Sequence, residues 1–136
     1  MKFGLHWILG VLTAVATMSV ASSALACRTI VPKASELATH KNLVVAGIDA
    51  AERLENSGWN TWRLTARKLN VVAGRPGPVA YTFSTTQSSD GCGITPLPLK
   101  GEKWVIYPDA SDPDKVLAAF PLSLARDYDP RLATVR

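Results

Sequence analysis

The sequence has little charge of one sign. Its 136 residues carry 15 Lys and Arg against 11 Asp and Glu, a net charge of +4, and these charges are spread along the chain. Proteins that hold nucleic acid through surface charge need a basic patch or stripe, which this composition does not supply. We therefore expect no nucleic-acid partner.

Histidine and cysteine are scarce as well, with two of each: His6, His40, Cys27 and Cys92. Catalysis needs convergent titratable groups or an activated nucleophile. His6 lies in a segment that we expect to be removed, so only His40 remains. A histidine-activated nucleophile and a two-histidine metal site are therefore excluded within one chain. His40 as a lone general base stays an alternative to a solvated loop residue, and we predict no catalytic residue, no cofactor and no metal site of the chain's own.

The longest apolar run lies at the amino terminus. It follows Lys2, covers residues 3 to about 20, and precedes Ala-Leu-Ala at 24–26, the small-x-small pattern that signal peptidase accepts. We interpret residues 1–26 as a cleaved secretory signal. The remaining 110 residues, 136 minus 26, are enough for one core and too few for two, so 27–136 is read as one domain. Its net charge is +3, 14 basic minus 11 acidic residues.

Two other interpretations of this amino-terminal segment stay open. Roughly 18 apolar residues nearly span a bilayer, which allows an uncleaved membrane anchor. The second is a lipoprotein acylated at Cys27, although that processing usually requires Leu where this chain has Ala24. We expect a periplasmic or secreted protein of a bacterial envelope, attached to the membrane only if the signal is retained or Cys27 is acylated.

Cys27 and Cys92 are expected to form one disulfide, because export places them where disulfides persist. The alternative is two free thiols. A bridge would close a loop of 65 positions, 92 minus 27. On the chain-entropy account such a loop stabilises a domain by about 4 kcal/mol.

Short segments of alternating polarity predict a mainly β protein. The predicted strands cover residues 43–54, 62–71, 79–84, 104–107 and 116–120. The alternation slips by one position in the second strand, which a bulge near Lys68 would absorb. Ser35 is expected to cap a short helical turn. Several short strands with little helix indicate a small antiparallel barrel or sandwich, with interior positions at Val45, Leu64, Phe83 and Ile106.

Two clusters of side chains invite a binding function. Asp109, Asp112 and Asp114 could offer oxygen ligands to calcium, but the Gly and distal Glu of the usual loop are missing, and Pro113 favours a polar turn. Aromatic residues could stack bases, yet most stand on alternating strand positions where burial is commoner. Trp59, in a predicted turn, is the best candidate for an exposed aromatic that anchors a protein partner.

Four sequence features follow one another along the chain. They are Cys27 at the mature terminus, Leu-Val-Val-Ala-Gly at 43–47, the glycine-containing turn 74–79, and Cys92-Gly93 followed by Gly101 and Trp-Val-Ile-Tyr at 104–107. In this order they resemble the netrin-like domain of the tissue inhibitors of metalloproteinases, over roughly residues 27–107, and the tail is similar to closing segments of bacterial members. The chain departs from the inhibitors at Arg28 and Thr29, where their Cys-x-Cys start is missing.

The resemblance implies a five-stranded antiparallel OB-fold barrel with short helical segments, and a non-enzymatic domain whose partner is another protein. In the inhibitor family the terminal Cys binds the zinc of a metalloprotease through its α-amine and carbonyl oxygen. By position this residue is Cys27, with Arg28 and Thr29 following it toward the protease cleft. A zinc metalloprotease is thus the candidate partner, and the rival function is a structural or assembly role for a lipoprotein acylated at Cys27.

Overall fold

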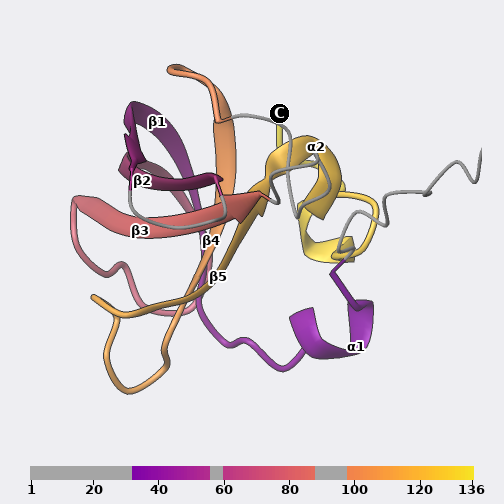
Figure 1. Ribbon diagram of the computed structural model, residues 1–136. Helices are drawn as coiled ribbons and strands as arrows, with labels where there is room; N and C mark the ends of the chain where they lie inside the picture. The colour runs from indigo at the N-terminus through magenta and orange to yellow at the C-terminus, as the bar shows by residue number, and fades with distance from the viewer. Residues whose placement is uncertain (1–31, 56–59, 88–97) are drawn as a thin grey trace, which may run out of the picture.

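The structure is a computed structural model that describes residues 32–55, 60–87 and 98–136 (Figure 1). The mainly β prediction is confirmed. The strands are β1 (Leu43–Leu54), β2 (Asn60–Ala73), β3 (Ala80–Gln87), β4 (Lys103–Pro108) and β5 (Val116–Pro121). Three short helical segments accompany them: α1 (Ala34–Leu37), α2 (Leu122–Ala125) and the 3-10 turn η1 (Pro130–Leu132). In this part of the chain no helix has the length and apolarity to cross a membrane.

All five strands lie in one antiparallel sheet with the order β3-β2-β1-β4-β5. The first three strands follow one another, and β4 then returns to pair with β1, which is a Greek-key arrangement. The expected five-stranded barrel is not closed, because no ladder joins β3 to β5 in the described residues. The two edge strands nevertheless run side by side, with Cα atoms within 8 Å of one another (Figure 1).

The bulge expected near Lys68 is confirmed. Val45 pairs with Asn70 and Ala46 pairs with Lys68, so Leu69 between them has no partner on β1. Its side chain extends over Gly47, where a Cβ atom would meet Leu69 Cδ1 at 3.4 Å. A bulge bends the strand that carries it, and the slip in alternation is the sequence signal of that bend.

The predicted helix cap is wrong. The helix α1 begins at Ala34 after Lys33, which has extended backbone angles (φ −86°, ψ 125°) and makes no side-chain cap hydrogen bond. Ser35 therefore lies inside the helix rather than before it. The backbone carbonyl of Lys33 accepts hydrogen bonds from Glu36 N and Leu37 N, and the burial of Leu37 anchors the turn. Packing of one apolar residue has outweighed the capping preference of serine.

Both faces of the sheet are covered, and each has its own core. The inner core consists of Val44, Ala46, Ile48, Leu64, Ala66, Tyr81, Phe83, Trp104 and Ile106. The outer core, beneath the helical segments, consists of Leu37, Leu43, Val45, Val105, Tyr107, Leu122, Ala125 and Leu132. The predicted interior residues are all buried, three of them in the inner core and Val45 in the outer core. Neighbouring residues of β1 and β4 thus serve opposite cores, as strand alternation requires.

Candidate functional site

The predicted disulfide and partner-binding residues lie outside the described part of the chain. This applies to Cys27, Arg28, Thr29, Trp59 and Cys92. The bridge and the role of the new amino terminus therefore stay predictions. What the structure does describe is the framework on either side of the segments that carry Trp59 and Cys92.

In this framework, the described strand ends that border two of those segments lie at one end of the sheet. Leu54 at the end of β1 pairs with Thr61, and Asn60 at the start of β2 pairs with Gln87 at the end of β3. The chain therefore leaves the described sheet, toward Trp59 and toward Cys92, from adjacent strand ends. We call this the loop end. Sequence separation alone does not reveal it, because Asn60 and Gln87 are 27 positions apart, 87 minus 60.

The opposite end is tied together by Asn42, which is buried. Its Nδ2 donates to the Asp109 carbonyl at 3.0 Å, and its Oδ1 accepts from Arg75 N at 2.9 Å. The turn at Gly74 has φ +79°, and a Cβ atom there would collide with the Asn42 side chain. One amide thus joins the β2–β3 and β4–β5 connections, and sequence reasoning missed it.

The acidic cluster near this end is a turn. Asp109 accepts hydrogen bonds from Ser111 N and Ser111 Oγ, both at 2.7 Å. These bonds, led by the Ser111 hydroxyl, lower the pKa of Asp109. Within the residues that the structure describes, no group of three or more acidic, histidine or cysteine side chains is arranged to hold a metal ion. The carboxylate is used to hold the backbone, as is common for Asp in turns.

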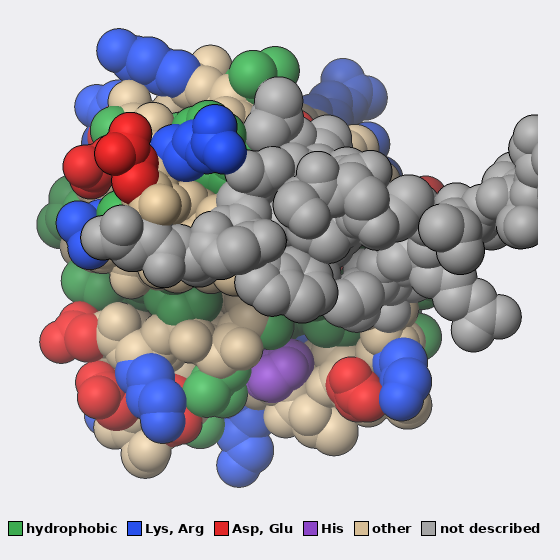
Figure 2. Space-filling view, viewed as in Figure 1, with side chains coloured by type: hydrophobic (Ala, Val, Ile, Leu, Met, Phe, Trp, Pro, Cys, Tyr) green, Lys and Arg blue, Asp and Glu red, His purple; other side chains and the backbone are tan. Residues whose placement is uncertain are grey.

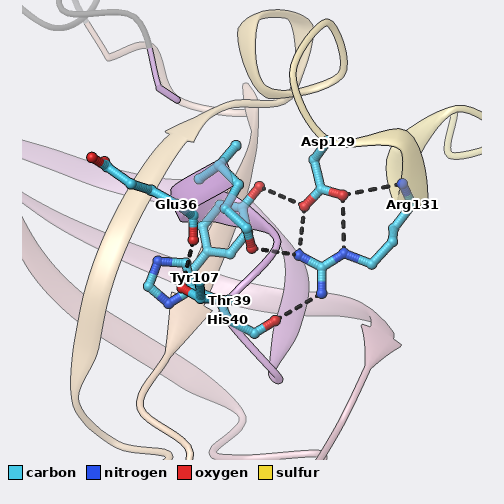
Figure 3. A network of polar contacts seen from close by, with 7 residues as sticks. Glu36, Thr39, His40, Tyr107, Asp129 and Arg131 are labelled. Atoms are coloured by element: carbon cyan, nitrogen blue, oxygen red, sulfur yellow. Dashed lines mark hydrogen bonds and ion pairs between the residues drawn. The ribbon is translucent and has the colours of Figure 1, made fainter. Parts of the chain in front are cut away.

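A buried polar network lies at the carboxyl end of the chain, and we call Tyr107, Asp129 and Arg131 the polar clamp (Figure 3). Arg131 holds the Asp129 carboxylate with two charge-assisted bonds, Nη2 to Oδ2 at 2.7 Å and Nε to Oδ1 at 2.9 Å. The Tyr107 hydroxyl donates to Asp129 Oδ2 at 3.1 Å. The same guanidinium donates to the carbonyls of His40 and Leu37, so the clamp joins η1 to β4 through Tyr107, to α1, and to the segment between α1 and β1.

The titration of the clamp reflects its burial. Burial alone would raise the pKa of Asp129, but hydrogen bonds and charge from Arg131, with the Tyr107 bond, outweigh it and lower that pKa. Burial, and then the charge of Asp129, raise the pKa of the Tyr107 hydroxyl. The His40 ring packs against Tyr107 with centroids 5.1 Å apart, and its carbonyl serves Arg131. These contacts give His40 a packing role, and the clamp fastens α1 and η1 to β4.

A groove of about 560 Å³ lies between the sheet edges, lined by residues 82–86 of β3 and 114–120. We call it the edge groove. Phe83 belongs to this lining and packs against Trp104, with ring centroids 5.9 Å apart. Asp114 and Lys115, of opposite sign, are the charged residues of its lining. Figure 2 likewise shows acidic and basic side chains interspersed on the face in view.

The aromatic side chains of the strands are mostly buried. Tyr81, Trp104 and Tyr107 are fully buried and Phe83 is nearly so. Trp62 is partly buried and packs against the inner core. The prediction that alternating strand aromatics are interior is confirmed.

Comparison of the chain with models of known protein families, with curated proteins and with solved structures finds no match.

Proposed function

We propose that this chain is an exported protein-binding domain without catalytic activity, built as a partly open barrel of the OB type. The Greek-key order of five antiparallel strands supports this assignment, because the OB-fold is a partly open five-stranded Greek-key barrel. The approach of β3 to β5 supports it further, since that is where such a barrel would close.

The loop end is the observation that carries the proposal. The segments that contain Trp59 and Cys92 leave the sheet from adjacent strand ends. A Cys27–Cys92 disulfide would tie the mature amino terminus to this same end. Cys27, Arg28 and Thr29 would then lie on one surface with Trp59. This surface would contain an aromatic residue and an arginine, which are residue types that contribute much of the binding energy in protein interfaces.

Inhibition of a zinc metalloprotease is the activity that this surface fits best. An α-amine has a reference pKa of about 8, so a substantial fraction is neutral at neutral pH and able to bind a metal. A catalytic zinc keeps one coordination position open, which the Cys27 amine and carbonyl oxygen would occupy. The disulfide would hold the amine in place and lower the ordering cost of binding.

The test compares the native mature protein with a variant that carries one extra Ala before Cys27. Both are assayed against a panel of zinc proteases, beside a control with the extra Ala after Arg136. We expect inhibition by the native and control proteins and none by the amino-terminal extension. Trp59→Ala should weaken inhibition without abolishing it. Absence of inhibition by the native protein well above micromolar concentration would remove the inhibitor proposal.

Intact mass of the purified mature protein separates this proposal from the lipoprotein alternative. A disulfide removes two hydrogen atoms from the calculated mass, whereas acylation at Cys27 adds several hundred daltons. A mass that shows acyl chains would replace the inhibitor proposal with an envelope-assembly role, because an acylated terminus has neither a free amine nor a free sulfur.

A further inference from the structure

The segment that leads from the proposed amino terminus to the sheet has few buried residues. Residues 32–41 precede Asn42 and the strand β1, and Pro32 and Leu37 are the only buried residues among them. The helix α1 in this segment has four residues and no side-chain cap hydrogen bond. A helix of this length is not stable alone, because most helical stability in proteins comes from tertiary contacts. The segment therefore depends on the contacts that fasten it to the folded domain.

Arg131 supplies the polar part of that fastening. Its Nη1 donates to the His40 carbonyl at 2.7 Å and its Nη2 donates to the Leu37 carbonyl at 2.9 Å (Figure 3). The Asp129 carboxylate holds the same guanidinium through Nε and Nη2. A guanidinium gripped in this way presents its remaining N–H groups in one fixed plane. Among the described residues, the hydrogen bonds that join residues 32–41 to the rest of the chain come from Arg131.

The connection from this segment to Cys27 is short. Cys27 lies five positions before Pro32, 32 minus 27, and five residues span at most about 18 Å. If residues 32–42 were released, Leu43 would become the nearest fixed residue, sixteen positions away, 43 minus 27, with a span of up to about 58 Å. The local concentration of a tethered group falls roughly as the −3/2 power of the tether length. Fastening the segment thus concentrates Cys27 near the folded domain.

We propose that Arg131 is a positioning residue for the mature amino terminus. It fastens residues 32–42 to the carboxyl-terminal part of the domain, and this keeps Cys27 close to its disulfide partner and confines the zinc-binding amine. The inference rests on the proposed function, which assigns those two roles to Cys27, and it adds the residue that supports them from the far end of the chain. Arg131 itself contacts neither zinc nor the partner and acts through α1.

The equilibrium of the Cys27–Cys92 pair with reduced and oxidised glutathione measures this positioning in the mature protein. Cys92 lies five positions after Gln87, 92 minus 87, so release of the segment lengthens the connection between fixed residues from five plus five positions to sixteen plus five. The equilibrium constant for forming the bridge should therefore fall about threefold. The variant is Arg131→Lys, which keeps the charge but lacks the planar fork that holds a carboxylate and two carbonyls at once.

Tyr107→Phe is the matched control. It removes a different bond to Asp129 and leaves every bond of Arg131 in place, so it should not change the equilibrium constant. Amide hydrogen exchange in both variants shows whether the segment is released. In Arg131→Lys, the amides of residues 38–40, which donate to carbonyls of the preceding turn, should lose their protection. The amide of Val105 in β4 should stay protected in both variants.

Three results would overturn the positioning role. The same equilibrium constant in the parent, Arg131→Lys and Tyr107→Phe would show that Arg131 does not place Cys27, and it would leave the proposed function untouched. Loss of protection at residues 38–40 without a change in the constant would show that the segment does not control the terminus. A parent protein that forms no Cys27–Cys92 bridge would overturn this inference together with the disulfide of the proposed function.

Discussion

The inner and outer cores are held in different ways. The buried residues of the inner core come from strands β1 to β4 and are all apolar or aromatic, and Val116 and Ala119 of β5 pack against them. The outer core is half made of short helical segments, and it includes the charged clamp of Asp129 and Arg131. Strands are already held by ladder bonds, so apolar packing completes them. Segments of three or four residues have no such support and need polar bonds to a fixed point.

The largest expected effect is on the inner core. Trp104 is fully buried and its Nε1 donates to Glu102 Oε2 at 3.0 Å. Trp104→Ala should lower the free energy of unfolding by about 4 kcal/mol, because it leaves a large cavity. Chemical denaturation measures this. Leu117→Ala is the control, since that side chain is exposed and should change stability by less than about 0.5 kcal/mol. A similar loss for both would contradict the division between core and surface.

In the outer core, removing one charge of the clamp should lower the free energy of unfolding without creating a large cavity. Arg131→Met leaves Asp129 buried without its partner and should cost about 3 kcal/mol at pH 7. Asp129→Asn removes the charge from the other side. The double variant should lose clearly less than the sum of the two single variants, which a double-mutant cycle measures. Strict additivity would mean that the two residues act independently.

The sign of the pH dependence sharpens this prediction. In the parent the pKa of Asp129 is lowered, so its contribution to stability is present above its unfolded value of about 4 and is lost as the pH falls. Without Arg131, burial raises that pKa above the unfolded value, and acidification then favours the folded state. The deficit of Arg131→Met relative to the parent should therefore shrink between pH 7 and pH 3. Denaturation at a series of pH values would show this.

A smaller effect is expected at Tyr107. Burial raises the pKa of its hydroxyl, so the folded state favours the protonated form and loses stability as the pH rises above about 10. Tyr107→Phe should cost about 1 kcal/mol at pH 7 through the lost bond to Asp129. It should also remove part of the alkaline destabilisation. Parallel unfolding curves from pH 8 to pH 11 compare the two proteins, and identical alkaline slopes would count against a clamp that depends on the neutral hydroxyl.

The smallest effect belongs to Ser35, which makes no cap. Ser35→Ala lies inside α1, where Ala is the better helix former, and should change the free energy of unfolding by less than about 0.5 kcal/mol. Thermal unfolding measures it beside Leu37→Ala, which empties a site in the outer core and should cost about 3 kcal/mol. A loss above 1 kcal/mol for Ser35→Ala would restore the capping role.

Alternation of side chains was a reliable guide wherever a strand has one buried face. The limits of β1 and the bulge beside Lys68 follow from it, as does the burial of Leu64, Phe83 and Ile106. The capping preference of serine was a poorer guide at Ser35, which lies inside α1 rather than before it. Sequence reasoning also missed the buried roles of Asn42 and Asp129. The sequence does not show whether a polar residue will find a hydrogen-bond partner in a distant segment.

The candidate sites likewise depend in part on the local sequence and in part on the tertiary structure. The strand at residues 80–87 can be predicted from the sequence, but β3 is an edge strand only because it ends the sheet opposite β5. The loop end likewise depends on the register of three strands. Local chemistry and periodicity determined the strands, the bulge and most of the core, because these depend on neighbours in the chain. Tertiary structure alone decided the strand order, the open edge and the partners of Asp129, because hydrogen bonds and charges between distant segments exist only once the chain has folded.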